Sequence, residues 1–204
     1  MHFIYIYSDG NRMKSVQMTV EFVILVIALV VIALVFASTV ITGSSPMPTS
    51  PRVRRTMMAV LPERLPGAPN AQIYELGSGW GGMAFALARR YPRHSVTGFE
   101  ISPLPWLAAR LRLAVNPRAN LRFRWVNFNK VDLSDAGLVV CYLFPSAMQT
   151  LALKFEHELE PGTLVLSNTF AIRAWRPVDE MTAKDQYASK VYLYEAGAQA
   201  REPG

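Results

Sequence analysis

Residues 73–82 read IYELGSGWGG, and this stretch decides the fold class. It joins a short apolar segment, typical of a buried β-strand, to an alanine-rich segment with helical spacing. Gly77, Gly79 and Gly81 allow the backbone to turn sharply and to approach a ligand, and the helix that follows presents unpaired N–H groups in its first turn. The stretch therefore predicts a loop between a strand and a helix that binds a nucleotide-type ligand.

The glycine spacing is compatible with two kinds of ligand. Gly77, Gly79 and Gly82 fit the pattern G-x-G-x-x-G, so the glycines alone do not separate a dinucleotide site from an S-adenosylmethionine site. Glu75, just before the loop, would oppose a pyrophosphate but suits the cationic methionyl end of S-adenosylmethionine. Glu100 closes the second predicted strand, 23 residues after Gly77, where a carboxylate can accept hydrogen bonds from both ribose hydroxyls. The two acids favour S-adenosylmethionine, with a dinucleotide as the alternative.

Short apolar segments alternate with amphipathic segments through the rest of the chain. The predicted strands cover residues 71–76, 95–100, 121–126, 138–144, 163–167 and 191–195, and the predicted helices cover 52–61, 82–90, 105–115 and 147–159. This alternation indicates an α/β, Rossmann-like fold with a mostly parallel sheet and helices on both faces. Ligands of such sheets lie beyond the carboxyl ends of the strands, where the glycine loop is expected.

The first part of the chain predicts a membrane anchor. Phe22–Ala37 is an unbroken apolar run, and no charged residue occurs between Glu21 and Arg52. As a helix, the uncharged stretch to residue 43 would measure roughly 33 Å, enough to cross a hydrocarbon core of about 30 Å once. A buried core helix and a cleaved signal peptide are the alternatives, although the run is longer than the roughly 7 to 15 apolar residues of a signal peptide. Two cations precede the run and three arginines follow it within residues 52–55, which favours a single-pass protein with its C-terminal domain facing the cytoplasm.

Composition limits the class of protein further. The 204 residues are 51% hydrophobic and 18% charged, which excludes a disordered chain, and the net charge of +6 suits an anionic membrane surface or an acidic partner. The single cysteine, Cys141, excludes an intramolecular disulfide and a cysteine-built zinc site, and the three histidines lack metal-ligand spacing, so no metal is expected. The predicted parts are a tail at 1–21, a transmembrane anchor at 22–42, a linker and pre-domain segment at 43–70, a globular domain at 71–197 and a tail at 198–204.

The motifs ELGSGWG and VTGFEISP resemble those of the class I, seven-β-strand S-adenosylmethionine-dependent methyltransferases. Within that superfamily the chain is similar to the membrane-anchored lysine N-methyltransferases that modify the ATP synthase c subunit or the adenine nucleotide translocase. This second resemblance rests on PMPTSPRVRRTMM before the domain, on NKVDLSDAGLVVCYLFP and on ELEPGTLVLSNTFAIRAW. It implies a seven-stranded sheet, S-adenosylmethionine as cosubstrate and a protein lysine as acceptor.

The resemblance also implies roles for individual residues around the cosubstrate. Its methionyl part would be held beside the glycine loop, its ribose by a carboxylate, and its adenine by residues after the second and third strands. The implied cosubstrate residues are Glu75, Gly77, Ser78, Gly79 and Gly81 for the methionyl part, Glu100 for the ribose, Ile101, Asn127 and Phe128 for the adenine, and Thr49 with Ser50 as a pre-domain closure. Asn127 stands where an aspartate is common, and its carbonyl can still accept a hydrogen bond from the adenine amino group.

The acceptor side is expected at the end of the fourth predicted strand. There CYLFP places Tyr142, Phe144 and Pro145 near the transferred methyl group, while Cys141 reads as a small buried hydrophobe. The sequence is not the N-P-P-[YF] motif of many methyltransferases that act on adenine or glutamine, which argues against nucleic-acid bases as substrates. Three residues after the fifth strand are further candidates for the acceptor channel, with plain packing as the alternative for the aromatic ones: Asn168, Phe170 and Trp175.

The leading hypothesis is a membrane-anchored protein-lysine N-methyltransferase that acts on a membrane-associated protein. Methyl transfer from a sulfonium is an in-line displacement that needs alignment more than a strong base or a metal, so a missing catalytic histidine is compatible with it. The alternatives are a methyltransferase of a lipid or small amphiphile, a tethered binding module with a degenerate site, and a membrane-tethered nicotinamide-dependent oxidoreductase.

Overall fold

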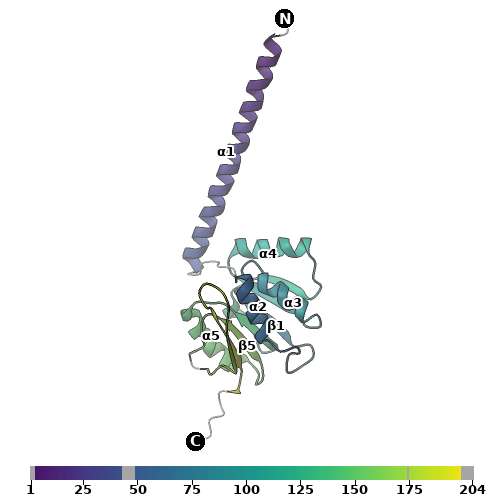
Figure 1. Ribbon diagram of the computed structural model, residues 1–204, viewed down its shortest axis with the longest axis vertical. Helices are drawn as coiled ribbons and strands as arrows, with labels where there is room; N and C mark the ends of the chain where they lie inside the picture. The colour runs from purple at the N-terminus through teal and green to yellow at the C-terminus, as the bar shows by residue number, and fades with distance from the viewer. Residues whose placement is uncertain (1–2, 43–48, 174, 199–204) are drawn as a thin grey trace. The chain divides into compact units, whose positions relative to one another are not determined.

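A computed structural model of the chain describes residues 3–42, 49–173 and 175–198. The chain forms two compact units, residues 1–43 and residues 44–204 (Figure 1). The described residues of the first unit form one helix, and the second unit contains a sheet with helices packed on it. The glycine loop and all other predicted site residues belong to the second unit.

The first unit is the helix α1, Phe3–Thr42. It begins well before the predicted start at residue 22, so the stretch expected as a tail is helical as well. No proline occurs within Phe3–Thr42, so no backbone hydrogen bond of the helix is lost to a proline. Residues Met13–Ala33 have a mean hydropathy of 2.6 and are long and apolar enough to cross a membrane. The predicted anchor extends to residue 42, and the structure does not describe the side chains of its residues 34–42.

The second unit is built on a seven-stranded sheet with strand order β3-β2-β1-β4-β5-β7-β6. The strands are β1 Gln72–Leu76, β2 Val96–Glu100, β3 Leu121–Trp125, β4 Ala136–Cys141, β5 Leu164–Asn168, β6 Asp179–Thr182 and β7 Lys190–Glu195. The first five strands pair in parallel, whereas β7 pairs antiparallel with both β5 and β6. The predicted α/β class with a mostly parallel sheet is confirmed, and the strand that the sequence analysis missed is β6.

β6 escapes prediction because all four of its residues are exposed. An edge strand without a buried face has no alternation of apolar and polar residues to mark it. β1 and β4, in contrast, lie in the middle of the sheet and are buried almost throughout. Central parallel strands are covered on both faces, which makes their sequences nearly continuous apolar runs.

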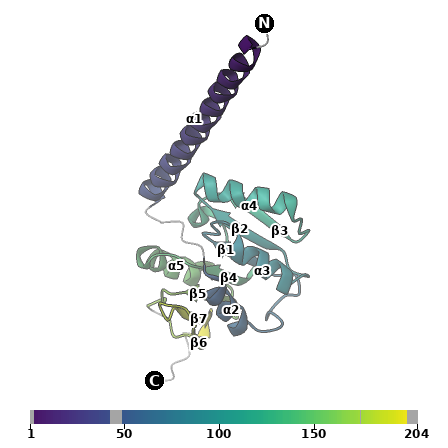
Figure 2. The same cartoon turned by 45° about the horizontal axis from the view of Figure 1, so that its top comes forward.

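Helices cover both faces of the sheet, as predicted (Figure 2). The helices are α2 Pro51–Val60, α3 Gly82–Arg90, α4 Pro103–Val115 and α5 Pro145–Glu158. The first core cluster joins α2, α3 and α4 to one face of the sheet. The second joins α5 to the other face and includes Phe99, Phe155 and Tyr194.

α2 packs on the sheet over β5, β6 and β7, and it begins with two local signals. The Ser50 hydroxyl oxygen accepts a hydrogen bond from the Val53 amide at 3.3 Å, and Pro51 occupies the first helical position. Val53, Met57 and Val60 recur at helical spacing and are buried. The pre-domain segment therefore contains a helix that packs on the domain core.

The contact between α5 and the sheet gives a stability test. Phe155 is fully buried and its ring lies 6.1 Å from that of Trp175, whereas Leu153 on the same helix is 62% exposed. We expect Phe155→Ala to lower the free energy of unfolding by about 3–5 kcal/mol because it leaves a cavity in the core. The matched variant Leu153→Ala should change it by less than about 0.5 kcal/mol. Urea titration of the full chain in detergent micelles, followed by tryptophan fluorescence, measures both; equal effects would contradict the assigned packing.

Candidate active site

The loop between β1 and α3 is held by backbone hydrogen bonds to β2. The amides of Gly77 and Ser78 both donate to the carbonyl oxygen of Phe99 at 2.9 Å, and the Gly81 amide donates to the carbonyl oxygen of Ser78 at 2.8 Å. Gly77, Gly79 and Gly81 have positive φ angles of 74°, 50° and 77°. The predicted sharp turn is present, and it lies at the carboxyl ends of β1 and β2.

Gly81 is required for two reasons. Its φ of 77° lies in the left-handed region, and a Cβ atom placed on it would come 2.6 Å from the Phe123 ring on β3. No side chain fits between this turn and that ring without displacing one of them. The loop is therefore packed directly on the sheet, with α3 starting at the next residue.

Glu75 is the last residue but one of β1 and carries a buried carboxyl group, 8% exposed. Burial raises the pKa of the Glu75 carboxyl to about 8; the backbone amide of Ala84 opposes this rise, and the negative charge of Glu100 adds to it. Glu75 Oε2 and the Ser78 hydroxyl oxygen are buried and have no hydrogen-bond partner among the described residues. Buried polar atoms without partners are rare in proteins, so these two mark a place where a ligand can donate hydrogen bonds.

Glu100 ends β2 and is also buried, 7% exposed. Its Oε2 accepts from the Gly79 amide at 2.7 Å, and its Oε1 accepts from the Ser102 amide at 2.8 Å. A carboxylate has about four lone-pair sites, so roughly two remain for further donors. The Glu100 carboxylate thus fixes the glycine loop and retains capacity to accept hydrogen bonds from a ligand.

The strand exits beside Glu100 carry apolar and aromatic side chains. Ile101, the predicted adenine contact, is 43% exposed, and its carbonyl oxygen accepts from Trp125 Nε1 at 2.8 Å. Trp125 stacks on Trp106 with ring centroids 5.8 Å apart. Neither tryptophan was among the predicted site residues. The signal that would have found them is that Trp125 ends β3 and Trp106 lies in the first turn of the helix after β2, two strands whose carboxyl ends meet at one edge.

Asn127 and Phe128 follow β3 in a short 3-10 turn, Phe128–Lys130. Asn127 Oδ1 accepts from the Asn129 amide at 2.9 Å and so caps this turn. A carbonyl oxygen has a second lone pair, so the cap leaves one acceptor position free for the predicted adenine contact. Phe128 is partly buried and packs against the second core cluster.

The predicted acceptor residues come together at the carboxyl ends of β4 and β5. Tyr142 stacks on Phe170 at 6.2 Å with an interplanar angle of 16°, and Phe144 lies 6.1 Å from the same ring. We call Tyr142, Phe144 and Phe170 the aromatic cluster. Leu143, between the first two, lies against the glycine loop, since a Cβ on Gly77 would be 3.0 Å from its Cδ2 atom. The segment that carries Tyr142 and Phe144 therefore adjoins the glycine loop.

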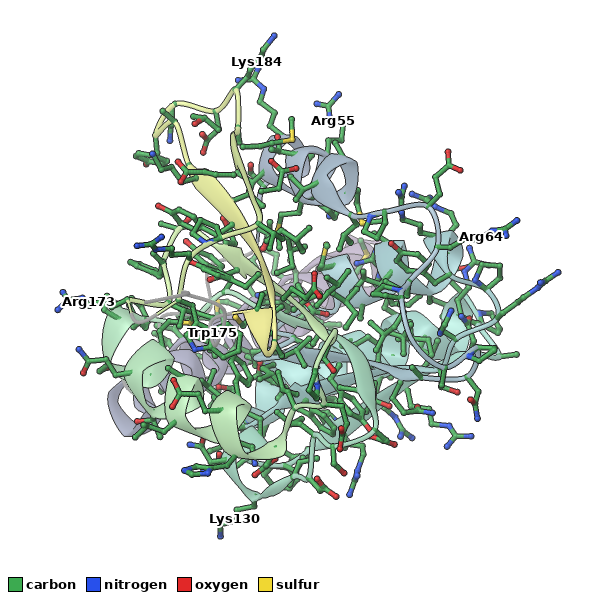
Figure 3. All side chains as sticks on the ribbon, turned by 90° about the horizontal axis from the view of Figure 1, so that it is seen from below. Arg55, Arg64, Lys130, Arg173, Trp175 and Lys184 are labelled. Carbon is green, nitrogen blue, oxygen red and sulfur yellow. The ribbon has the colours of Figure 1, made fainter. Side chains whose placement is uncertain are left out.

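Other predicted acceptor residues have different surroundings. Trp175 is buried, 6% exposed, between Phe155 and Tyr194, and its Nε1 donates to Glu156 Oε1 at 3.3 Å (Figure 3). The packing alternative is therefore correct for Trp175, which lies under α5. Pro145 is the first residue of α5, and Asn168 is buried at the end of β5, where its Oδ1 accepts from the Thr169 hydroxyl at 3.0 Å.

The pre-domain segment reaches the glycine loop through Arg54. A Cβ on Gly82 would lie 3.2 Å from an Arg54 guanidinium nitrogen, which places this cation at the start of α3. Thr49 is half-buried, and Ser50 caps α2. Within the described parts of the chain, no group of three or more histidine, cysteine, aspartate or glutamate side chains is arranged to hold a metal ion.

Glu75 makes the stability of the domain depend on pH. Below its ordinary pKa of 4.5 the carboxyl is protonated in the folded and unfolded states alike, whereas between 4.5 and about 8 it is ionised only in the unfolded state. Stability is therefore lost as the pH rises through this interval. We expect Glu75→Gln, which stays neutral, to gain stability relative to the wild type up to about pH 8, with a constant difference above that value.

Urea titrations of the full chain in micelles at a series of pH values, without added ligand, measure this difference. Glu63→Gln, at an exposed glutamate, is the matched control and should follow the wild type. Parallel profiles of wild type and Glu75→Gln would contradict the assignment of a buried neutral carboxyl.

Sequence comparisons give one family. The model of the ANTKMT methyltransferase domain matches residues 75–179. A protein-lysine N-methyltransferase of Saccharolobus islandicus is 30% identical over 161 residues, which cover 74% of this chain and 92% of that protein. The mouse adenine nucleotide translocase lysine N-methyltransferase is 32% identical over 117 residues, covering 56% of this chain and 49% of the mouse protein.

Solved structures give the same fold. An RNA methyltransferase of Salinibacter ruber in complex with S-adenosyl-L-homocysteine has a TM-score of 0.64 and 27% identity, and the match covers 78% of this chain and 97% of that one. A Bacillus subtilis tRNA methyltransferase has a TM-score of 0.57 at 14% identity, with 74% of this chain and 68% of that one covered. With the strand order, the glycine loop and the family match in agreement, this chain belongs to the ANTKMT methyltransferase domain family and is an S-adenosylmethionine-dependent methyltransferase of class I.

Proposed function

We propose that this chain is a membrane-anchored protein-lysine N-methyltransferase that acts on a membrane-associated protein. The observation that carries the proposal is the contact of Leu143 with Gly77, which joins the aromatic cluster to the loop expected to hold the cosubstrate. The curated relatives support a lysine acceptor, since both are described as lysine N-methyltransferases. The apolar helix α1 supports the anchor.

The residues at the carboxyl ends of β1 and β2 fit S-adenosylmethionine. Glu75 Oε2 and the Ser78 hydroxyl are buried acceptors without partners among the described residues, and they suit the ammonium group of the methionyl part. Glu100 has lone pairs left for the ribose hydroxyls after binding two backbone amides. The roles assigned to the other loop glycines, to Ile101, Asn127 and Phe128 at the adenine, and to Thr49 as a closure are part of this proposal.

The aromatic cluster suits a lysine acceptor. S-adenosylmethionine supplies a methyl group on a sulfonium: the new N–C bond forms as the C–S bond breaks, and the sulfur keeps the electron pair as a neutral thioether. A lysine ammonium has an ordinary pKa of about 10.4, so it must lose a proton to water before it can attack. The ring faces of the aromatic cluster attract the lysine cation as it enters. Their exclusion of bulk water favours the neutral amine, which is the form that attacks.

Membrane anchoring would concentrate the enzyme beside membrane proteins. We propose that α1 spans the bilayer once and that the domain faces the cytoplasm, or the equivalent compartment that contains S-adenosylmethionine. A tethered enzyme and a tethered substrate meet at a raised effective concentration. The alternative acceptor, a lipid or small amphiphile, would use the same cosubstrate site and the same tether.

Removing the Glu100 carboxyl tests the cosubstrate site. We expect Glu100→Ala to weaken binding of S-adenosylhomocysteine by about tenfold or more, because hydrogen bonds to a charged group contribute about 1.5–3 kcal/mol each. Calorimetric titration of the full chain in micelles measures the affinity, and circular dichroism checks the fold. Glu195→Ala, at an exposed glutamate of β7, is the control and should bind like the wild type. Unchanged affinity in Glu100→Ala, or binding of NAD in place of S-adenosylhomocysteine, would contradict the assignment.

Removing the central ring of the aromatic cluster tests the acceptor side. We expect Phe170→Ala to lower the rate of methyl transfer to membrane proteins by about tenfold, because the ring's attraction for the lysine cation and its exclusion of water are lost together. Affinity for S-adenosylhomocysteine should stay unchanged. Tyr142→Phe keeps the stacked ring and is the matched control, with a rate close to the wild type.

The assay uses membranes and S-adenosylmethionine with a labelled methyl group. Label recovered as methyl-lysine after hydrolysis of the protein fraction supports the proposal. Label in the solvent-extracted lipid fraction would show that the acceptor is a lipid. Label in RNA would show that the acceptor is RNA, the substrate named for the Salinibacter ruber methyltransferase.

A further inference from the structure

The helix α4 presents an apolar face to solvent. Leu107, Leu111 and Val115 are 47%, 60% and 84% exposed, and with the half-buried Leu104 they recur at spacings of three and four residues. Residues at these spacings share one side of a helix. We call Leu104, Leu107, Leu111 and Val115 the α4 stripe. A surface helix normally turns its polar side outward, so an outward apolar stripe indicates a contact surface.

The opposite side of α4 is already used for packing. Pro105 and Ala109 are buried, and Trp106 and Leu113 pack against the first core cluster, which joins the helix to β2 and β3 (Figure 2). The helix is thus apolar on two sides. The α4 stripe adds nothing to the fold of the domain, and its apolar character calls for a partner outside the domain.

Cations flank the α4 stripe. Arg110 lies over the Trp106 ring at 5.7 Å and Arg112 over the Phe85 ring at 4.5 Å, one on each side of the stripe by helical spacing. Residues 101–131 contain six cations and no aspartate or glutamate. The cations are Arg110, Arg112, Arg118, Arg122, Arg124 and Lys130. An apolar stripe bordered by arginines is the arrangement of helices that lie in the interface of an anionic bilayer.

We infer that α4 is a second membrane contact, which docks its stripe into the interface of an anionic lipid bilayer. RNA would use the cations but has no use for an aliphatic stripe, since single strands stack on aromatic rings. A second copy of the chain, paired through the same stripe, would bring like-charged arginines together. Docking through α4 would fix which side of the catalytic domain faces the bilayer, which a membrane-spanning segment elsewhere in the chain does not determine.

A fluorophore on the stripe tests the inference in the full chain. NBD is attached at Leu111→Cys in a Cys141→Ala background, and the protein is placed in phospholipid nanodiscs with or without phosphatidylglycerol. We expect brominated acyl chains to lower the NBD emission roughly twofold or more in anionic discs, because an interfacial helix buries its apolar face about 5–10 Å into the headgroup and acyl boundary. A probe at Tyr187→Cys, in the loop between β6 and β7, should stay unquenched.

Two sets of variants test the apolar and the electrostatic parts of the docking separately. Leu107→Asp should abolish the quenching at residue 111 without lowering the thermal unfolding temperature, because Leu107 is exposed. Each of Arg110→Gln and Arg112→Gln should weaken docking to anionic discs by about fivefold. A probe at Ile24→Cys reports insertion of α1 separately, so a failure of the anchor and a failure of α4 docking are distinguishable.

Equal emission at residue 111 with brominated and ordinary lipids in both kinds of disc would overturn the inference. If the NBD emission at residue 111 rises with protein concentration in the absence of lipid, the stripe contacts a second copy of the chain. If the emission changes only when RNA is added, the surface binds nucleic acid. Quenching at residue 187 equal to that at 111 would show that the domain contacts lipid without a preferred side.

Discussion

Two carboxyl groups buried at neighbouring strand ends constrain the whole catalytic unit. Glu75 lies one residue before the end of β1 and Glu100 ends β2, where water is largely excluded, so each carboxyl group needs hydrogen-bond donors. Backbone amides meet Glu100 from both sides, whereas Glu75 keeps one buried oxygen without a partner among the described residues. The glycine loop supplies donors to Glu100, and we propose that a ligand with an ammonium group supplies them to Glu75.

The glycine loop links this constraint to the chemistry. It bends over Phe123 at Gly81, starts α3 at the next residue, and meets Leu143 after β4 at Gly77. The same loop therefore touches the Glu100 carboxylate, the start of a helix and the segment that carries the aromatic cluster. Because these contacts are made by backbone and packed side chains, the fold fixes the relative positions of the two sites that we propose for cosubstrate and acceptor. Lysine chemistry then needs alignment and a desolvated amine more than a strong base.

Sequence patterns predicted those elements for which the local residue preferences agree with the burial that the whole fold imposes. The glycine loop, the two acids and the central strands follow from turn chemistry and from apolar runs that only a covered sheet needs. β6 was missed because its side chains are all exposed, and α1 was predicted too short because polar residues before the apolar run do not stop a helix without a proline. For Trp175 the sequence left the acceptor channel and plain packing open, since it does not say which face of the sheet an aromatic residue in a loop will reach, and the residue packs against α5. Trp106 and Trp125 were missed for the same reason.

The most direct test of the central claim is a proton count on ligand binding. S-adenosylhomocysteine is titrated into the full chain near pH 7 in buffers of different ionisation enthalpy, and the dependence of the heat on the buffer gives the protons released. Since the Glu75 carboxyl with its pKa of about 8 is mostly protonated at this pH, binding of an ammonium group beside it should release about one proton per ligand. The release should disappear in Glu75→Gln. Heats that do not depend on the buffer, or equal proton release by wild type and variant, would contradict the claim that the ligand's ammonium group binds the buried Glu75 carboxylate.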